Sequence, residues 1–210
     1  MTFDNYLAVV APRVREIPGW CPDEQGHQLY RLVLELERRG PLIVEIGSFL
    51  GKSAIVMALA LQARDDHGLV VCIDPWDGSG DADSALIYRE LTHPEMPLAA
   101  EFRANVAAAG VLDYVATVPM RSHEARSHWA EDGCDGLYLD GDHEYDAVRQ
   151  DLDDWAPLVR PHGWLAMDDV YDPPAGGPGR AAAEFFSRSL GWERVAMCGR
   201  MLVVRRALDW

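Results

Sequence analysis

Apolar positions along the 210-residue chain fall into short continuous runs separated by stretches with helical spacing. The short runs are typical of buried parallel strands and cover residues 42–46, 69–73, 114–118, 135–139 and 164–167. The helical stripes predict helices over residues 3–17, 24–39, 52–63, 82–91, 99–109, 122–130, 145–158 and 180–190. Two final runs, 192–197 and 201–205, predict an antiparallel hairpin. This alternation predicts an α/β fold: a Rossmann-like, seven-stranded, mostly parallel sheet with helices on both faces and a C-terminal antiparallel hairpin.

The length suits a single domain with a sizeable core. Residues 1–40 would form an N-terminal helical cap. Residues 78–98 are polar, acidic and interrupted by glycine and proline, which is typical of an insertion. Because open α/β sheets bind ligands beyond the carboxyl ends of their strands, we interpret this insertion as a candidate substrate cover. A merely decorative loop is the alternative.

A glycine loop joins the first strand to the following helix in the segment Glu45–Ser53, Glu-Ile-Gly-Ser-Phe-Leu-Gly-Lys-Ser. Such a loop presents backbone N–H groups and a helix N-terminus to an anionic or polar ligand. Three residues separate Gly47 from Gly51, one fewer than the Walker pattern requires, and the Gly-x-Gly-x-x-Gly dinucleotide fingerprint also fails. An ordinary turn, in which the glycines supply unusual backbone angles, is the alternative to a ligand-binding loop.

An acid, Asp74, follows the second strand in the sequence Asp74-Pro75-Trp76-Asp77. A carboxylate at the tip of the strand after a glycine loop can accept hydrogen bonds from both hydroxyls of a ribose. The alternative is a turn aspartate before proline. With the glycine loop upstream, we favour the ribose interpretation.

Acidic residues also follow the fourth and fifth strands. Asp140, Asp142 and His143 come directly after the fourth strand, and Asp168 and Asp169 follow the fifth. Neighbouring strands lie about 5 Å apart, so these carboxylates should converge, and unpaired carboxylates repel each other. A divalent cation such as Mg²⁺ would stabilise them, with calcium or manganese as alternatives. The competing interpretation is that Asp140 and Asp142 cap the next helix.

The net charge of −15 argues against a nucleic-acid partner and suits a small molecule, a cationic cofactor or a divalent metal. The four cysteines form no Cys-x-x-Cys pair, so neither a zinc site nor a redox motif is indicated. We found no apolar stretch long enough for a membrane span and no signal peptide, and therefore expect a cytoplasmic protein without a membrane partner. A first helix outside the core is compatible with a homo-oligomer.

Taken together, these motifs resemble class I S-adenosylmethionine (SAM)-dependent methyltransferases. The segment Glu45–Ser53, the run Leu139-Asp140-Gly141-Asp142-His143 and the pair Asp168-Asp169, which begins 28 residues after Asp140, are similar to the metal-dependent macrocin and mycinamicin sugar O-methyltransferases and to cephalosporin-hydroxylase-like proteins. A more distant resemblance is to catechol O-methyltransferase. The resemblance covers roughly residues 20–170.

The resemblance implies that residues 1–210 form one methyltransferase domain with SAM and Mg²⁺ as cofactors. The residues that would bind SAM are Glu45, Gly47, Ser48, Phe49, Gly51, Ser53, Asp74, Trp76, Ser122, His123 and Asp140. Asp140, Asp168 and Asp169 would bind the metal, and His143 would be the catalytic general base. The sugar enzymes commonly have Glu-Asp where this chain has Asp168-Asp169. Catechol enzymes have Asp-Asn there and use a lysine as base, whereas the only lysine here, Lys52, lies in the glycine loop.

The implied activity is methylation of a hydroxyl group on a small molecule, either a sugar or a natural product. Two alternatives stay open. One is a metal-independent methyltransferase that acts on another small acceptor, and the other is a protein that binds SAM without catalysis.

Overall fold

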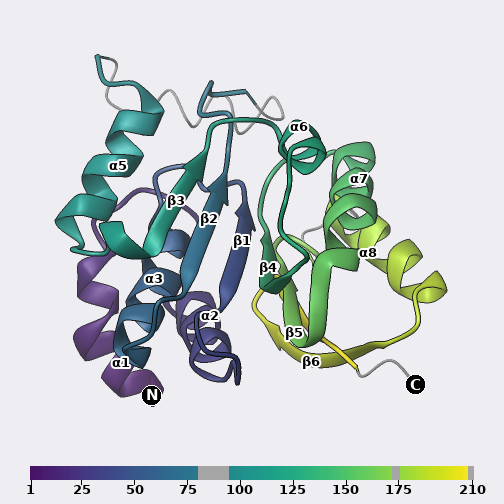
Figure 1. Ribbon diagram of the computed structural model, residues 1–210, viewed down its shortest axis with the longest axis horizontal. Helices are drawn as coiled ribbons and strands as arrows, with labels where there is room; N and C mark the ends of the chain where they lie inside the picture. The colour runs from purple at the N-terminus through teal and green to yellow at the C-terminus, as the bar shows by residue number, and fades with distance from the viewer. Residues whose placement is uncertain (80–94, 172–175, 208–210) are drawn as a thin grey trace.

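The computed structural model describes residues 1–79, 95–171 and 176–207, and its strands form one seven-stranded sheet in the order β3-β2-β1-β4-β5-β7-β6 (Figure 1). The strands are β1 (Leu42–Ile46), β2 (Leu69–Ile73), β3 (Val115–Val118), β4 (Cys134–Leu139), β5 (Val159–Met167), β6 (Trp192–Cys198) and β7 (Met201–Arg206). Strands β1 to β5 are parallel, and β7 pairs antiparallel with both β5 and β6. The predicted seven-stranded, mostly parallel sheet with a terminal hairpin is therefore confirmed.

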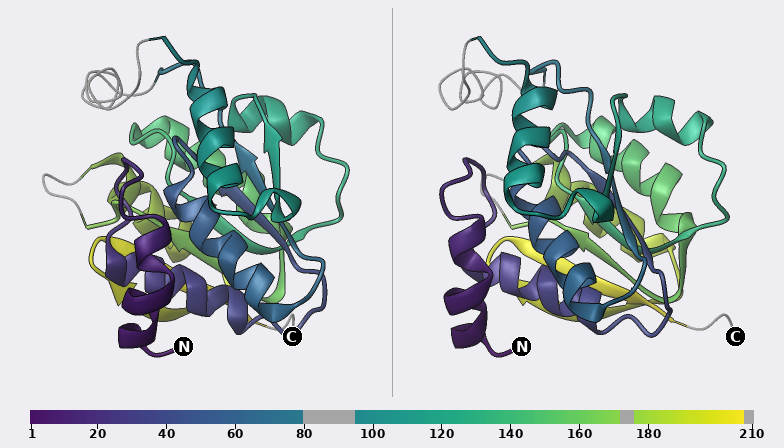
Figure 2. Two further views of the ribbon diagram at one scale, coloured as in Figure 1. Left: turned by 90° about the vertical axis from the view of Figure 1, so that its left-hand side faces the viewer. Right: turned by 60° about the vertical axis from the view of Figure 1, so that its left-hand side comes forward.

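Helices cover both faces of the sheet (Figures 1 and 2). Those packed on one face are α1 (Phe3–Val9), α2 (Asp23–Leu34), α3 (Lys52–Arg64) and α5 (Leu98–Ala108). Those on the other face are α6 (Ser122–Ser127), α7 (Tyr145–Trp155) and α8 (Gly177–Arg188). Short 3-10 helices are η1 (Ala11–Arg13), η2 (Leu112–Tyr114) and η3 (Ala156–Leu158). The predicted helix over residues 82–91 and most of the predicted insertion lie outside the described residues.

Two hydrophobic cores follow from the alternation of side chains along the strands. In β1, Ile43 packs with the core beneath α2 and α3, whereas Val44 and Ile46 pack with the core beneath α7 and α8. In β4, Leu137 and Leu139 belong to the second core. The central strands are thus buried on both faces, which explains why they appear in the sequence as continuous apolar runs.

The first two helices are shorter than predicted. α1 ends at Val9, and Pro12, which lacks a backbone N–H, lies in the separate 3-10 turn η1. α2 ends at Leu34 because the guanidinium of Arg64 donates hydrogen bonds to the carbonyl oxygens of Val33, Leu34 and Leu36. α2 supplies the predicted residues Leu29, Leu32 and Val33 to the core. In α1 the core contacts come from Tyr6, whereas Val9, expected on the apolar face, is 61% exposed.

Other boundaries shift where local geometry favours it. The strand predicted from residue 164 begins earlier, at Val159, with a register shift against β4. The helix predicted over 180–190 is α8, which begins at Gly177 with Pro178 in its first turn, where a missing N–H costs nothing. The helix predicted over 122–130 ends at Ser127.

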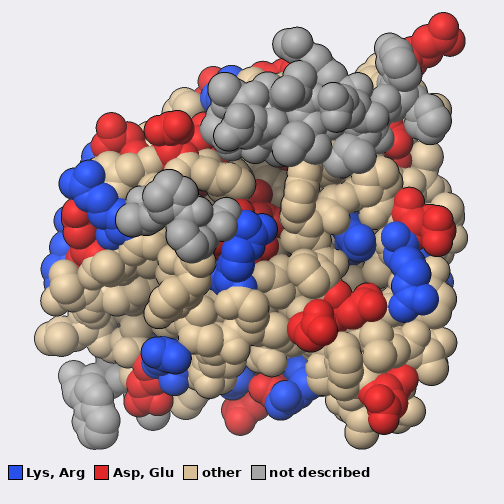
Figure 3. Space-filling view, turned by 180° about the vertical axis from the view of Figure 1, so that it is seen from behind, with Lys and Arg blue, Asp and Glu red and all other residues tan. Residues whose placement is uncertain are grey.

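The surface carries charges of both signs. Viewed from behind, Lys and Arg side chains lie among Asp and Glu side chains in small groups with uncharged areas between them (Figure 3). The described part of this face has no extended basic area of the kind that a phosphate backbone requires. Across the described ranges, no helix combines the length and the apolar character needed to cross a membrane.

Candidate active site

A cavity of about 540 Å³ lies beyond the carboxyl ends of the parallel strands. It is bounded by the glycine loop after β1, the turn after β2, the start of α6 and the loops after β4 and β5. The predicted site residues that line it are Gly47, Ser48, Phe49, Ser53, Asp74, Trp76, Ser122, His123, Asp140, His143 and Asp169. The fold therefore gathers most of the residues chosen from the sequence around one space.

The two loop glycines are required by backbone geometry. Gly47 has φ +86°, and a Cβ atom there would lie 2.1 Å from the carbonyl oxygen of Asp140. Gly51 has φ +88° and begins α3, and a Cβ atom there would lie 2.9 Å from the ring of Phe102. Only glycine fits either position, so the loop can approach the end of β4 closely.

Asp74 ties the turn after β2 to the glycine loop. Its Oδ2 accepts hydrogen bonds from the backbone N–H groups of Ser48 at 3.0 Å and Phe49 at 2.9 Å, and its Oδ1 accepts one from Trp76 at 2.7 Å. Burial raises the pKa of this carboxyl, and the three backbone donors oppose that shift. A ribose at the predicted position would share these oxygens with the loop.

Two aromatic residues hold the loop in a strained conformation. Phe49 has φ +43° and Trp76 has φ +48°, and the indole N–H of Trp76 donates a hydrogen bond of 2.8 Å to the carbonyl oxygen of Phe49. The ring of Phe49 lies 5.9 Å from that of Trp20, which is 43% exposed. Non-glycine residues with positive φ concentrate at functional sites, where the surrounding structure enforces them.

Glu45 supports the loop from behind the cavity. Its side chain is fully buried, and its Oε1 accepts a hydrogen bond of 2.6 Å from the hydroxyl of Ser53. Burial raises the pKa of Glu45 to about 7, although hydrogen bonds from neighbouring side chains lower it. Within the described ranges, neither Glu45 nor Gly51 lines the cavity. Both residues shape the predicted cofactor loop from outside that space.

The raised pKa of Glu45 predicts a pH dependence of stability. Between pH of about 4.5 and 7 the folded protein holds a proton that the unfolded chain has lost, so the free energy of unfolding should fall as pH rises through this window. The loss attributable to Glu45 is about 3 kcal/mol. Urea unfolding at several pH values should show a flatter profile for Glu45→Gln. The exposed-site variant Glu37→Gln should keep the wild-type slope, and an unchanged slope in Glu45→Gln would contradict this assignment.

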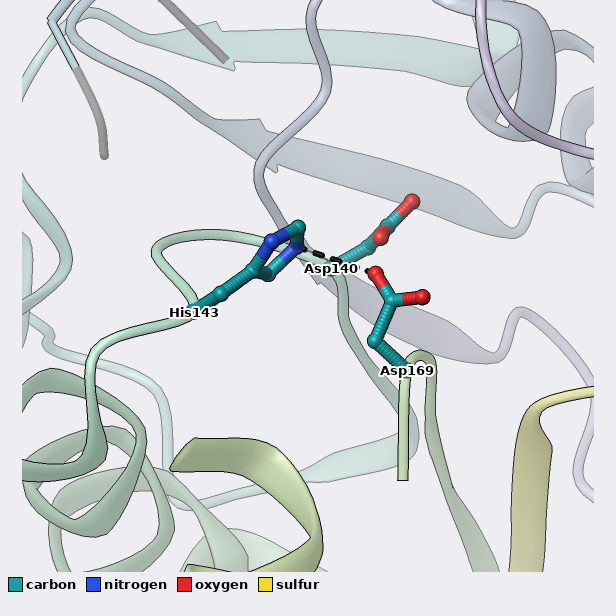
Figure 4. A group of neighbouring side chains, drawn as sticks. All are labelled: Asp140, His143 and Asp169. Carbon is teal, nitrogen blue, oxygen red and sulfur yellow. Dashed lines mark ion pairs between the residues drawn. The ribbon is translucent and has the colours of Figure 1, made fainter. Parts of the chain in front are cut away.

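Asp140, His143 and Asp169 form an acid–histidine cluster at the ends of β4 and β5 (Figure 4). Their ligand atoms all lie within 4.8 Å of one another, and His143 Nε2 lies 3.0 Å from Asp169 Oδ2. Burial raises the pKa of Asp140 well above its usual range, and the nearby charges of Asp168 and Asp169 raise it further. The predicted convergence of acids from two strand ends is thus present, with His143 among them.

Asp168 is held by hydrogen bonds outside this cluster. Its Oδ1 accepts a hydrogen bond of 2.9 Å from the side-chain amide of Gln25 and another of 2.9 Å from the backbone N–H of Asp169. Asp142 accepts a hydrogen bond from the backbone N–H of Glu144 and shapes the turn before α7. Of the three predicted metal ligands, Asp140 and Asp169 therefore share the cluster, while Asp168 does not belong to it.

Three residues that contact the acids had no role predicted for them. Gln25 is 3% exposed and holds Asp168 from α2. Tyr138 donates a hydrogen bond of 3.1 Å from its hydroxyl to Asp140 Oδ2, and Arg200 forms an ion pair of 3.0 Å with Asp169 Oδ1. The sequence could have pointed to Gln25, because this polar residue lies among the buried, mostly apolar positions of α2. Arg200 lies in the turn between β6 and β7, where its position depends on the tertiary fold.

The donor set of the cluster fits a divalent cation. The carboxylates of Asp140 and Asp169 converge, and burial, together with the charges of Asp168 and Asp169, raises the pKa of Asp140, an effect that a bound cation would offset. Asp169 has a strained backbone angle of φ +55°, and its carboxylate points toward His143 (Figure 4).

Residues 44–170 match the model of a family described as a methyltransferase domain. The chain belongs to this family. The match covers more than half of the sequence and runs from β1, through the glycine loop and the acid–histidine cluster, to the end of β5. It confirms the prediction that the protein is a methyltransferase.

Solved structures agree with this assignment of the fold. NovP, an O-methyltransferase, superposes with a TM-score of 0.75 at 18% identity and covers 98% of each chain. An O-methyltransferase from Bacillus cereus in complex with SAH gives 0.63 at 17% identity, over 98% of this methyltransferase and 90% of that chain. TomG from Streptomyces achromogenes is an O-methyltransferase involved in tomaymycin synthesis and was solved with SAM. It superposes with a TM-score of 0.64 at 19% identity, over 97% of this chain and 90% of TomG. At such identities the likeness shows the fold.

Proposed function

We propose that this methyltransferase transfers a methyl group from SAM to a hydroxyl group of a small molecule, a sugar or a natural product, with the help of Mg²⁺. The observation that carries the proposal is that the acid–histidine cluster and the glycine loop line the same cavity. The similar structures solved with SAM or its product SAH, and their names as O-methyltransferases, support the choice of cofactor and reaction. The narrower resemblance to the sugar O-methyltransferases supports the choice of acceptor.

The residues of the chain divide the work between binding and proton transfer. Asp74 and the glycines fix the loop that lines one side of the cavity, and Asp74 itself accepts hydrogen bonds from the loop N–H groups of Ser48 and Phe49. When bound, SAM supplies an electrophilic methyl group, and Mg²⁺ supplies positive charge that favours ionisation of an acceptor hydroxyl. Holding donor and acceptor at attack distance in the cavity would provide most of the rate enhancement.

His143 is the proposed general base, and Asp169 orients it. If Nε2 donates its hydrogen to Asp169 Oδ2 at 3.0 Å, the basic lone pair lies on Nδ1. With its basic nitrogen on the side away from Asp169, His143 can accept the proton of the acceptor hydroxyl. Asp169 would also stabilise the positive charge that His143 gains.

The metal requirement has a direct calorimetric test. We expect Mg²⁺ to bind the wild-type protein and to bind Asp140→Asn and Asp169→Asn at least about tenfold more weakly, because each change removes a charged ligand. Asp146→Asn is a matched control, since Asp146 is an acid of α7 whose side chain is 88% exposed. Equal Mg²⁺ affinity in Asp140→Asn and the control would contradict a metal site at the cluster.

A specific contact favours a metal-independent methyltransferase as the second candidate. Arg200 pairs with Asp169 at 3.0 Å, so the chain itself supplies a cationic partner to this acid beside the hydrogen bond from His143. A metal-independent enzyme would keep its rate of methyl transfer in EDTA. A Mg²⁺-dependent enzyme would lose methyl transfer in EDTA and recover it when Mg²⁺ is added. A protein that binds SAM without catalysis is the remaining alternative, and it predicts binding of SAM without turnover on any hydroxylated acceptor.

A further inference from the structure

A buried glutamine of α2 contacts the segment that follows β5. Gln25 is 3% exposed, and its Nε2 donates a hydrogen bond of 2.9 Å to Asp168 Oδ1, across 143 residues of sequence. Its Oε1 has no hydrogen-bond donor within the described part of the chain. A buried amide oxygen without a donor costs stability, so packing of α2 alone would favour an apolar residue at this position. The proposed mechanism of methyl transfer gives Gln25 no role.

The oxygen of Asp168 that Gln25 holds also fixes the backbone of Asp169. Asp168 Oδ1 accepts a hydrogen bond of 2.9 Å from the backbone N–H of Asp169. Asp169 has φ +55°, an angle that residues other than glycine rarely adopt and that the surrounding structure must enforce. Its carboxylate lies 3.0 Å from His143 Nε2 (Figure 4). A continuous series of contacts therefore runs from the Gln25 amide, through Asp168, to the residue that orients the imidazole.

The turn between β6 and β7 holds the same segment. The backbone N–H of Val170 donates a hydrogen bond of 3.1 Å to the carbonyl oxygen of Arg200, and the Arg200 guanidinium lies 3.0 Å from Asp169 Oδ1. At the end of β6, the carbonyl oxygen of Cys198 lies 3.5 Å from Gln25 Nε2. α2 and the terminal hairpin, which are far apart in the sequence, thus meet at the segment that carries Asp169.

We infer that Gln25 is a positioning residue of the active site. By holding Asp168, it keeps Asp169 at the backbone angle at which the carboxylate of Asp169 meets His143. The inference rests on the proposed function, which makes His143 the general base and the acid–histidine cluster a cation site. Hydrogen-bond partners behind metal-binding groups fix the geometry of those groups, and their loss commonly weakens metal binding about 10- to 100-fold.

Gln25→Met tests the inference, because methionine is similar in length to glutamine and has no N–H to donate. The ¹H–¹⁵N spectrum of histidine rings reports which ring nitrogen carries the proton, and it requires neither metal nor turnover. The signals of His143 are identified by their absence from His143→Ala. In Gln25→Met we expect them to move toward their positions in Asp169→Ala, in which the contact with the carboxylate is lost.

Calorimetry supplies a second measurement on the same variant. Gln25→Met should bind Mg²⁺ at least about tenfold more weakly than the wild-type protein. Its affinity for S-adenosylhomocysteine should be unchanged, because Gln25 does not line the cavity. Gln28→Met is the matched control, since it makes the same change at a partly exposed position of α2 that also lies outside the cavity lining. The control should keep the wild-type His143 signals and the wild-type Mg²⁺ affinity.

Two further variants show whether Gln25 acts through Asp168. Asp168→Ala should displace the His143 signals as Gln25→Met does, and combining the two changes should add nothing. A further displacement in the combined variant would overturn the inference. If Gln25→Met does not fold, Gln25→Asn keeps the amide on a shorter side chain that cannot reach Asp168, and it should give the same displacement.

His143 signals at their wild-type positions in a folded Gln25 variant would overturn the inference and leave the proposed function intact. Equal displacements in Gln25→Met and Gln28→Met would also overturn it, because they would report a general disturbance of α2. Failure of the wild-type protein to bind Mg²⁺ would contradict the metal requirement of the proposed function. The histidine spectrum of the metal-free protein would still decide the role of Gln25.

Discussion

His143→Ala should lower the turnover number by about 100- to 10,000-fold, the usual contribution of a general base. The dissociation constant for S-adenosylhomocysteine should change by no more than about threefold, because removing a proton acceptor leaves uniform binding intact. The physical reason is the orientation of the imidazole, held at 3.0 Å by Asp169 at the edge of the cavity. The measurement is steady-state kinetics on a responsive acceptor beside calorimetry of the product.

His128→Ala is the matched control for this prediction. His128 is an exposed histidine at the end of α6, and it does not line the cavity. Its replacement should leave both turnover and binding at wild-type values. Normal turnover in His143→Ala would remove this residue from the mechanism, whereas an equal loss of product affinity would indicate a structural role.

Gly47→Ala should weaken binding of S-adenosylhomocysteine at least about 100-fold and lower the melting temperature by about 5–15 °C. The added methyl group would lie 2.1 Å from the carbonyl oxygen of Asp140, at a backbone angle of φ +86° that alanine rarely adopts. Either the glycine loop or the loop that carries the acid–histidine cluster must then move. Calorimetry and thermal unfolding measure the two effects.

Gly40→Ala separates the clash from the backbone strain. Gly40 also has a positive φ of +61°, but the atom nearest to the position that an added methyl group would occupy is 3.9 Å away, and the residue lies outside the cavity lining. The variant should lose about 1 kcal/mol of stability and keep its ligand affinity. If Gly47→Ala behaved like Gly40→Ala, close packing of the two loops would not be a requirement for binding.

The strands and the glycine loop could be predicted because their signals are local. A buried parallel strand such as β1 is a continuous apolar run, and the unusual backbone angles at Gly47 and Gly51 leave glycine as the only suitable residue. Helix ends were less predictable, since tertiary contacts set them. The end of α2 depends on Arg64, a residue about 30 positions later in the sequence.

In the site, too, features set by local sequence could be predicted, whereas features set by tertiary contacts could not. Convergence of Asp140 and Asp169 could be expected from the positions of two adjacent strand ends. The divergence of Asp168 from Asp169 could not, because it depends on a hydrogen bond to Gln25 that spans 143 residues of sequence. The contacts of Tyr138 and Arg200 likewise require the folded chain, and their residue types alone carry no such information.

A calorimetric titration of S-adenosylhomocysteine into the protein, with ATP as the control ligand, tests whether the cavity holds a methyl donor. We predict binding of S-adenosylhomocysteine at about micromolar affinity and no binding of ATP, because the loop between Gly47 and Gly51 is one residue short of a phosphate-binding loop. Binding of ATP without binding of S-adenosylhomocysteine would contradict the assignment of this cavity to a methyl donor.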